Sequence, residues 1–311
     1  MIERSPNAQP CPKLAIRNAP RVLGQLIRRM ARDLIVMALL CTLAVWMRLE
    51  PSSSNLVLME SSSLNTLGIA ISVFVAFRNT QAINRWWESR ILWGGIVNLS
   101  RHWRDSLNTL LLSHAEGATE HQRLLNLQVL LCWLLNFELR GYRRRDAALA
   151  AGTLSDELGL QADVSLQQGL ILRADELRRL YDAGMINDWG RDALLRTSET
   201  FLNALGGLQR IRNSPIPPTY DVFIRLICWF YGFAQFLNFN NRGDVWEGLI
   251  LFIGFVTAER VGAYVENPFD LDGSCVCIPM DSICRTISTD LLGPQNPLAR
   301  LPISHDPSRW S

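Results

Sequence analysis

The sequence predicts an all-α membrane protein whose subunit has four membrane-spanning helices and a separate helical bundle outside the membrane. Apolar residues make up 48% of the 311 positions while 19% are charged, so the apolar residues have to be concentrated in part of the chain. Four long apolar segments contain most of them. The region between the second and third segments is charged and has apolar residues at three- and four-residue spacing, which is typical of helices.

The four apolar segments are the predicted spans. A bilayer core about 30 Å thick requires about 20 largely apolar residues in a helix. The segments are Leu34 to Met47, Leu64 to Phe77, Tyr220 to Phe239 with one charge at Arg225, and Val245 to about Tyr264 with Glu247, Glu259 and Arg260 towards its ends. Each is short or charged for an isolated span, which is expected where spans pack together and turn their polar groups inward.

The basic residues that flank the spans predict the orientation, because Lys and Arg are retained on the cytoplasmic side. They precede the first span and follow the second: Arg28, Arg29 and Arg32, then Arg78, Arg85, Arg90, Arg101 and Arg104. The loops Pro51 to Asn55 and Asn238 to Asp244 carry little positive charge. Four crossings with both termini in the cytoplasm satisfy this pattern.

The remaining segments follow from this topology. Leu124 to Leu139 is apolar, but Arg123, Glu138 and Arg140 crowd its ends, so we predict a core helix of the cytosolic bundle. Asp163 and Ser165 are candidate caps of short helices in the same bundle. The predicted parts are an N-terminal segment 1–27, a span pair 28–77, a mainly cytosolic bundle 78–219, a span pair 220–264, a cytosolic helical segment 265–292 and a proline-rich tail 293–311, disordered or draped on a surface.

Composition excludes several other classes. A formal charge of +2 gives no case for nucleic acid as a partner. Seven cysteines, several of them in apolar runs, do not form a secreted disulfide pattern. The spacing Cys275-x-Cys277 with Cys284 lacks the ligand pattern of a zinc site, so we expect no metal and no cofactor. Met1 to Pro20 holds charges and prolines before any apolar run, so we expect no cleaved signal peptide.

The second span has two patterns at four-residue spacing. Ile69, Val73 and Phe77 share one helical face, and the small residues Gly68, Ser72 and Ala76 share the neighbouring face. Small residues at this spacing let membrane helices approach closely. A symmetric ring of such helices would therefore turn the large residues towards a common axis as a narrow apolar throat, which controls ion flow by dewetting. Periodicity alone fits equally an ordinary helix pair with these residues in its core.

Several ordered motifs narrow the choice. The run Leu67 to Asn79 is followed by Asn84-Arg-Trp-Trp-Glu-x-Arg90 and Leu92-Trp-Gly-Gly95, and later by Ser214-Pro-Ile-Pro217, Asn267-Pro-Phe269, Pro279-Met-Asp281 and Cys284-Arg-Thr-Ile287. Together these motifs resemble the bestrophin ion channels, the bacterial members most closely. The resemblance covers the chain from about Arg28 to Leu292.

The resemblance implies a homo-oligomer, a pentamer, in a bacterial inner membrane. It places a pore neck at Ile69, Val73 and Phe77 and a cytosolic aperture at Ile216, before Pro217, where an Ile-Pro peptide is stiff and extended. The alternative for Ser214 to Pro218 is a simple linker. Family members mostly conduct chloride and other small anions, and some bacterial members favour monovalent cations such as sodium.

The resemblance does not imply calcium activation for this chain. Animal members bind calcium through acidic residues after the Asn-Pro-Phe motif, whereas here only Asp270 and Asp272 follow Phe269, an incomplete set of oxygen ligands. Arg85-Trp86-Trp87-Glu88 is either part of an interfacial aromatic belt or a coupling element between the neck and the bundle.

Two rival classes stay open at this point. Arg225, Glu247 and Glu259 are charged residues in spans, which is a feature of membrane enzymes and proton relays. The four histidines, His102, His114, His121 and His305, form no metal-ligand pair, and the sequence contains no nucleophile elbow or phosphate loop, so we expect no enzyme. A structural membrane protein without a pore is the second rival.

Overall fold

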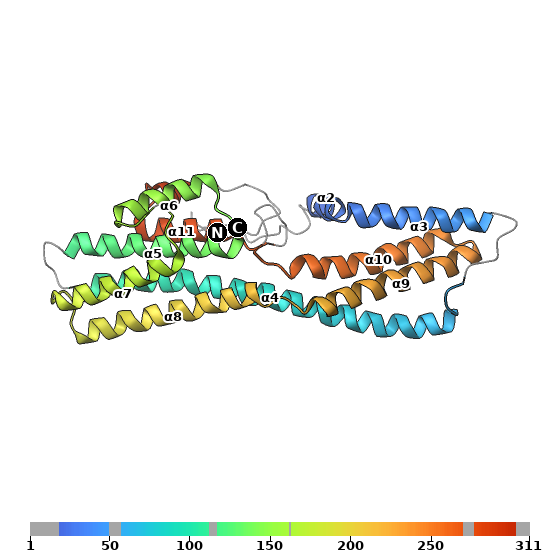
Figure 1. Cartoon of the computed structure of the whole chain (residues 1–311), viewed down its shortest axis with the longest axis horizontal. Helices are drawn as coiled ribbons and strands as arrows, with labels where there is room; N and C mark the ends of the chain where they lie inside the picture. The colour runs from blue at the N-terminus through green and yellow to red at the C-terminus, as the bar shows by residue number, and fades with distance from the viewer. Residues whose placement is uncertain (1–18, 50–56, 112–116, 162, 270–276, 303–311) are drawn as a thin grey trace, which may run out of the picture.

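The computed structural model describes residues 19–49, 57–111, 117–161, 163–269 and 277–302, and within these ranges it contains helices and no strand (Figure 1). The all-α prediction is confirmed. The elements in chain order are α2 (Ala19–Arg29), α3 (Ala31–Leu49), α4 (Ser61–Leu110), α5 (Gly117–Arg140), α6 (Arg145–Glu157), α7 (Leu166–Asp182), α8 (Asp188–Asn213), α9 (Pro218–Arg242), α10 (Val245–Val265), α11 (Met280–Leu292) and the short 3₁₀ helix η1 (Pro297–Arg300).

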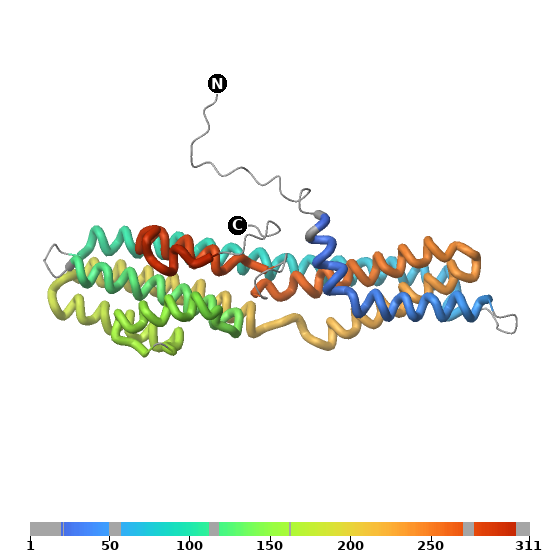
Figure 2. Tube along the Cα trace, turned by 90° about the horizontal axis from the view of Figure 1, so that it is seen from above, coloured from blue at the N-terminus to red at the C-terminus, as the bar shows by residue number. Residues whose placement is uncertain are grey.

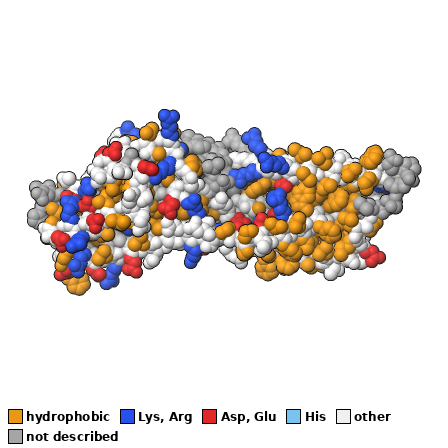
Figure 3. All heavy atoms as spheres, in the orientation of Figure 1, with side chains coloured by type: hydrophobic (Ala, Val, Ile, Leu, Met, Phe, Trp, Pro, Cys, Tyr) orange, Lys and Arg blue, Asp and Glu red, His pale blue; other side chains and the backbone are white. Residues whose placement is uncertain are grey.

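The helices form an elongated molecule with two halves arranged end to end (Figures 1 and 2). The apolar half consists of α2, α3, α9, α10 and the first part of α4, and the polar half consists of the rest of α4 with α5 to α8, α11 and η1. On the face drawn in Figure 3, hydrophobic side chains gather over the apolar half, and charged ones lie over the polar half and where the halves meet. This separation is expected of a chain that is half inside a bilayer.

A single helix connects the two halves. α4 has 50 residues, so it is about 75 Å long at 1.5 Å per residue, more than twice the thickness of a bilayer core. The sequence predicted that the span ends at Phe77 and that a separate bundle begins at residue 78. Instead the helix continues, because buried residues such as Ala82, Trp93 and Trp103 keep a helical spacing beyond Arg78. The boundary at residue 78 is therefore not a break in the chain's structure.

The predicted number of spans agrees with the structure. Among the described residues, α4, α9 and α10 are long and apolar enough to cross a membrane, and α3 makes a fourth when it is joined to α2, from which it is bent by 64°. α9 and α10 form a hairpin closed by Gly243, whose φ of 103° lies in the left-handed region that favours glycine. Four spanning helices therefore fit the apolar half.

The predicted core helix of the bundle is confirmed. α5 lies in the centre of the polar half, and residues from Leu124 to Leu139 are buried along it. Trp133 is fully buried, and its Nε1 donates to Ser288 Oγ of α11 at 3.1 Å. The predicted cap Ser165 begins α7, where its side chain accepts from Gln168 N while Gln168 Oε1 accepts from Ser165 N.

The C-terminal part packs against the polar half as far as it is described. The predicted helical segment 265–292 contains α11, and η1 follows within the predicted tail. Leu298 and Ala299 of η1 are buried, and Arg285 Nε donates to the Ala299 carbonyl at 2.7 Å. Residues 293–302 are therefore held on the surface, and residues 303–311 lie outside the described part of the chain.

Candidate ion pathway

The predicted neck residues form an open apolar stripe on α4. Ile69, Val73 and Phe77 are 71%, 49% and 63% exposed in the single chain. On the opposite side of the same helix Ile71 and Val75 are buried against α9. The helix therefore has one face that packs within the subunit and one face with large apolar side chains that stand exposed among the described residues.

The apolar half has a layered arrangement that sets α4 apart from α3. Both helices contact α9 and α10, and they do not contact each other, so the α9–α10 hairpin lies between them (Figure 1). The exposed side of α3 is largely large and apolar, with Ile35, Leu39, Leu43 and Trp46. The exposed side of α4 alternates large apolar residues with small or polar ones. The surface of α3 suits lipid, whereas that of α4 suits contact with other α4 helices.

The predicted small-residue stripe is divided between two environments. Ser72 and Ala76 are exposed beside the neck residues, and the Ser72 hydroxyl donates to the Gly68 carbonyl of its own helix at 2.7 Å. Gly68 is buried, and a Cβ at this position would overlap Tyr231 of α9. Gly68 therefore permits close packing of α4 on α9 inside the subunit, and only Ser72 and Ala76 are free to meet another chain.

A buried arginine directly follows the predicted neck residues. Arg78 follows Phe77 directly, but its side chain is 1% exposed and points into the subunit. It forms an ion pair with Asp221 of α9, its Nη1 donates to the Glu259 carbonyl at 2.8 Å, and the carboxylates of Glu259 and Glu266 lie 3.6 Å from its guanidinium. We call Arg78, Asp221, Glu259 and Glu266 the junction network. It joins α4 to α9 and α10 where the two halves meet.

A second group of charges continues this network towards α3. Asp33 Oδ1 accepts from Arg260 Nη2 at 2.7 Å, Asp33 Oδ2 lies 2.7 Å from Arg260 Nε, and Arg225 lies 3.6 Å from Asp33. The carboxylate oxygens of Glu259 accept no hydrogen bond from the described residues, and Arg260 lies 3.7 Å away. Charges at the inner ends of the spans are therefore neutralised mostly by one another, as buried charges require.

Arg85 connects α4 to the end of α8. Its guanidinium donates to the carbonyls of Ser214, Ile211 and Glu266. The next two residues, Trp86 and Trp87, stack with ring centroids 6.3 Å apart. This geometry favours the coupling role over a plain aromatic belt, because Arg85 binds the backbone at the end of α8 and the end of α10 together.

Ile216 lies in the connection between α8 and α9, about halfway along the molecule (Figure 1). Its side chain is half-buried, and its backbone N–H donates to Glu266 Oε1 at 3.0 Å. The sequence placed it at the cytosolic mouth of a pore. In the structure Ile216 lies where the two halves of the molecule meet, and its role as an aperture stays a prediction.

Comparison with known proteins identifies the family. The model of the bacterial and fungal bestrophin family matches residues 9–293, which is most of the chain. This chain is a bestrophin. A protein of Synechocystis named as a voltage-dependent anion channel-forming protein is 30% identical over 236 residues, which cover 72% of this chain and 74% of that protein. A Ralstonia nicotianae protein of the same description is 26% identical over 278 residues, 88% and 89% of the two chains.

Solved structures agree with the fold. The crystal structure of a bacterial bestrophin homologue from Klebsiella pneumoniae has a TM-score of 0.71 at 20% identity, and the match covers 88% of this chain and all of that one. Family membership and the long apolar helices together make this bestrophin an integral membrane protein. Its named relatives are channel-forming proteins and not enzymes.

The charged span residues behind the enzyme hypothesis form no single constellation. Glu247 lies in the first turn of α10, just over three turns from Glu259 near the other end of the same helix. Across the described residues, no group of three His, Cys, Asp or Glu side chains is arranged to hold a metal ion. Asp270 and Asp272, the acids considered for calcium, and Cys275 lie outside the described residues.

Sequence reasoning missed the role of Arg78, which it counted as one of several basic flanking residues. A signal was present, because Asp221, Glu259 and Glu266 stand at the inner ends of the third and fourth spans, where an isolated acid would be costly. Acids at these positions require a cation, and Arg78 is the basic residue at the matching end of the second span.

Proposed function

We propose that this bestrophin is one subunit of a ring-shaped ion channel in which α4 from every subunit lines the axis. The observation that carries the proposal is the open stripe of Ile69, Val73 and Phe77 on α4, where the small residues Ser72 and Ala76 are exposed beside it. In a ring, this stripe forms a neck with three apolar levels. Such a constriction holds water off and limits ion flow without any charged group.

The ring is a homopentamer in this proposal. Support comes from the resemblance of the neck motif to that of bestrophins and from Ser72 and Ala76, which let neighbouring α4 helices approach closely. The lipid bilayer covers the apolar side chains of α3. Of the exposed apolar surfaces of α3 and α4, the α4 surface is then the one turned away from lipid.

The permeant ions are small monovalent anions, chloride first. Support comes from the relatives, which are named as anion channel-forming proteins. The neck itself carries no charge that selects the sign of the ion, so sodium or another monovalent cation is the alternative. Ile216 forms a second, narrower level at the inner side of the junction, held by its backbone bond to Glu266.

The protein sits in a bacterial inner membrane with both termini in the cytoplasm. The basic residues around the apolar half support this orientation, because Arg28, Arg29 and Arg32 lie at the end of α2 and α3 that adjoins the polar half. The variant Asp244→Cys places a thiol in the exposed α9–α10 turn. A membrane-impermeant thiol label is then expected to react with it from outside whole cells. A label that reaches Asp244 only after lysis would contradict the orientation.

Planar-bilayer recording in asymmetric sodium chloride tests the function. We expect single-channel currents from the purified protein, with a reversal potential close to the equilibrium potential of chloride. A reversal potential near that of sodium would keep the channel and reverse its selectivity. Absence of current from a correctly assembled protein would contradict the proposal and favour a structural role.

A further inference from the structure

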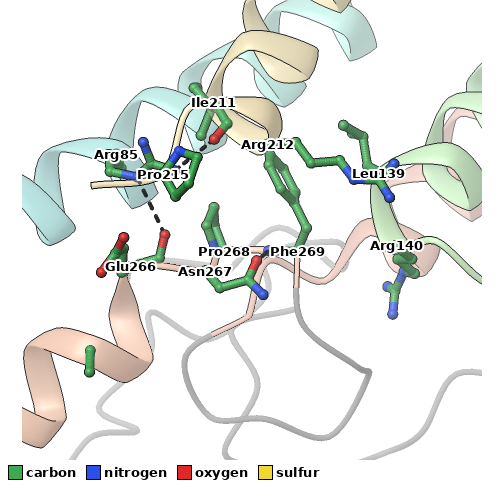
Figure 4. Close-up of a pocket in the computed structure, with 11 residues that line it drawn as sticks. Arg85, Leu139, Arg140, Ile211, Arg212, Pro215, Glu266, Asn267, Pro268 and Phe269 are labelled. Carbon is green, nitrogen blue, oxygen red and sulfur yellow. Dashed lines mark hydrogen bonds between the residues drawn. The ribbon is translucent and has the colours of Figure 1, made fainter. Parts of the chain in front are cut away.

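A cavity of about 420 Å³ opens where the two halves meet. Its wall includes Arg85 of α4, Arg140 at the end of α5, Arg212 at the end of α8, and the segment Glu266 to Phe269 after α10. In Figure 4, Arg85 and Glu266 lie on one side, Arg140 and Arg212 on the other, and Asn267 to Phe269 between them. Cavities of this size bind small molecules in many proteins.

The charges of the wall are unbalanced. Three guanidinium groups face one carboxylate, Glu266, and that carboxylate already accepts from Ile216 N at 3.0 Å and lies 3.6 Å from Arg78. Arg140 is balanced from behind, because Asp281 lies 3.4 Å from its Nη2. The excess positive charge therefore resides on Arg85 and Arg212.

Neither of these two arginines has a carboxylate partner among the described residues. Arg85 donates only to backbone carbonyls, which hold its guanidinium in place without cancelling its charge. The Arg212 side chain makes no hydrogen bond or ion pair with the part of the chain that the structure describes, and its Nη2 lies beside Gly141. Asn267 uses its Oδ1 to accept from Phe269 N at 3.4 Å, so its amide N–H groups remain as donors.

Arg85, Arg212 and the Asn267 amide thus present hydrogen-bond donors to the cavity, and two of these groups are cationic. We propose that this cavity binds a small oxyanion, a phosphate or carboxylate compound, between Arg212 and Arg85. The planar guanidinium group presents paired N–H donors that match the oxygens of a carboxylate or phosphate. Chloride would use this geometry poorly, because a spherical ion has no pair of oxygens.

A ligand in this place would contact three elements at once. Arg212 belongs to the end of α8, Arg85 to α4 eight residues beyond Phe77, and Asn267 to the segment after α10. Two of them, α4 and the segment after α10, adjoin the junction network through Arg78 and Glu266. Binding at this cavity is measured by titration and not by current. The proposal therefore does not depend on whether the neck conducts ions.

The test is calorimetric titration of the purified full-length oligomer with inorganic pyrophosphate and, separately, with succinate. Ionic strength is held constant with sodium chloride. The variant is Arg212→Gln, which removes the charge of a side chain that has no described partner to lose. The matched control is Arg196→Gln on the same helix, an exposed arginine whose Nη2 lies 2.8 Å from Asp192 Oδ2.

We expect saturable binding of at least one probe to the wild-type protein and to Arg196→Gln, and affinity at least about tenfold weaker in Arg212→Gln, as expected for loss of a charge-assisted hydrogen bond. Saturation by pyrophosphate alone would assign the site to phosphates, and saturation by succinate alone to carboxylates. No saturable binding of either probe, or equal affinity in the two variants, would overturn the proposal.

Discussion

At the scale of single residues, Arg78 has the greatest consequence for the apolar half. Its guanidinium is fully buried and faces three carboxylates, those of Asp221, Glu259 and Glu266. Breaking a buried ion pair by removing one partner is costly, because the other charge is left without compensation. Arg78 therefore holds α4 against α9 and α10 next to the apolar stripe.

Arg78→Gln should lower the free energy of unfolding by about 3–5 kcal/mol, the usual cost of an orphaned buried charge. Adding Glu259→Gln should restore part of this loss, because it removes one of the orphaned charges. The control is Arg101→Gln, whose partner Asp290 is partly exposed and whose loss should cost at most about 1 kcal/mol. Denaturant unfolding in detergent measures all three. Equal losses for Arg78→Gln and Arg101→Gln would contradict the role of Arg78.

Glu176 in the polar half makes stability depend on pH. Burial favours its neutral form, but hydrogen bonds from Arg123 Nε at 2.7 Å and from Arg179 outweigh burial, so the pKa of Glu176 lies below its ordinary value. A carboxyl with a lowered pKa stabilises the folded state above its unfolded pKa, and this stabilisation is lost as the pH falls.

Glu176→Gln should therefore destabilise the protein at pH 7, by about 1–3 kcal/mol for loss of charge-assisted hydrogen bonds. The difference from wild type should shrink as the pH is lowered to about 4 and below, where the wild-type carboxyl takes up a proton. Chemical unfolding at several pH values measures this difference. A difference that stays constant or grows on acidification would contradict the prediction.

At the scale of elements, α4 shows both what the sequence could predict and what it could not. The spacing of Ile69, Val73 and Phe77 was sufficient to place them on one face, because helical periodicity fixes angular position. The sequence could not decide whether that face was covered, and it assigned Gly68 to contacts between subunits. Gly68 instead faces Tyr231 of the same chain. Which side of α4 packs on α9 is decided by residues more than 150 positions away in the sequence, so the local periodicity of α4 could not predict it.

Two glycines of α4 should respond in opposite ways to the same substitution. Gly68→Ala should destabilise by about 1–3 kcal/mol, because the added methyl group overlaps the Tyr231 ring and forces α4 away from α9. Gly94→Ala should stabilise by up to about 1 kcal/mol, since its Cβ meets nothing within 4 Å and alanine favours the helix. Thermal unfolding midpoints of the two variants measure this. Destabilisation by Gly94→Ala would show that another chain packs there.

At the scale of the whole molecule, hydropathy and flanking charge were sufficient to predict four spans and a separate helical bundle. They predicted a boundary at residue 78, where the structure has a continuous helix, because a rise in charge marks the edge of a membrane and not the end of a helix. The junction network also escaped prediction, since it joins positions on three spans, Arg78, Asp221 and Glu266, that only the folded packing brings together.

The number of subunits in the assembly is a property of the whole molecule, and the mass of the assembly measures it. Ser72→Leu places a large side chain on the exposed small face of α4 and should dissociate the oligomer. Ala38→Leu makes the same kind of change on the exposed face of α3, which we assign to lipid, and should leave the oligomer intact. Native mass spectrometry in detergent compares the two. A wild-type monomer, or an intact Ser72→Leu oligomer, would contradict the proposed packing.

The neck itself can be tested with two variants of identical composition on one helix. The first changes the exposed stripe: Ile69→Ala, Val73→Ala and Phe77→Ala. The second changes the same three residue types elsewhere on α4: Ile71→Ala and Val75→Ala, both buried, with Phe74→Ala, whose ring packs edge-on against Phe223. Both lose the same apolar volume.

The decisive measurement is chloride flux from liposomes that hold equal amounts of assembled protein. Trimming the stripe should wet the neck in every subunit, so the first variant should give a flux well above wild type. The second variant should lower thermal stability without raising flux, because Ile71 and Val75 are buried and the partly exposed Phe74 packs against Phe223 of the same subunit. Unchanged flux in the first variant, with assembly intact, would mean that Ile69, Val73 and Phe77 do not line the pore.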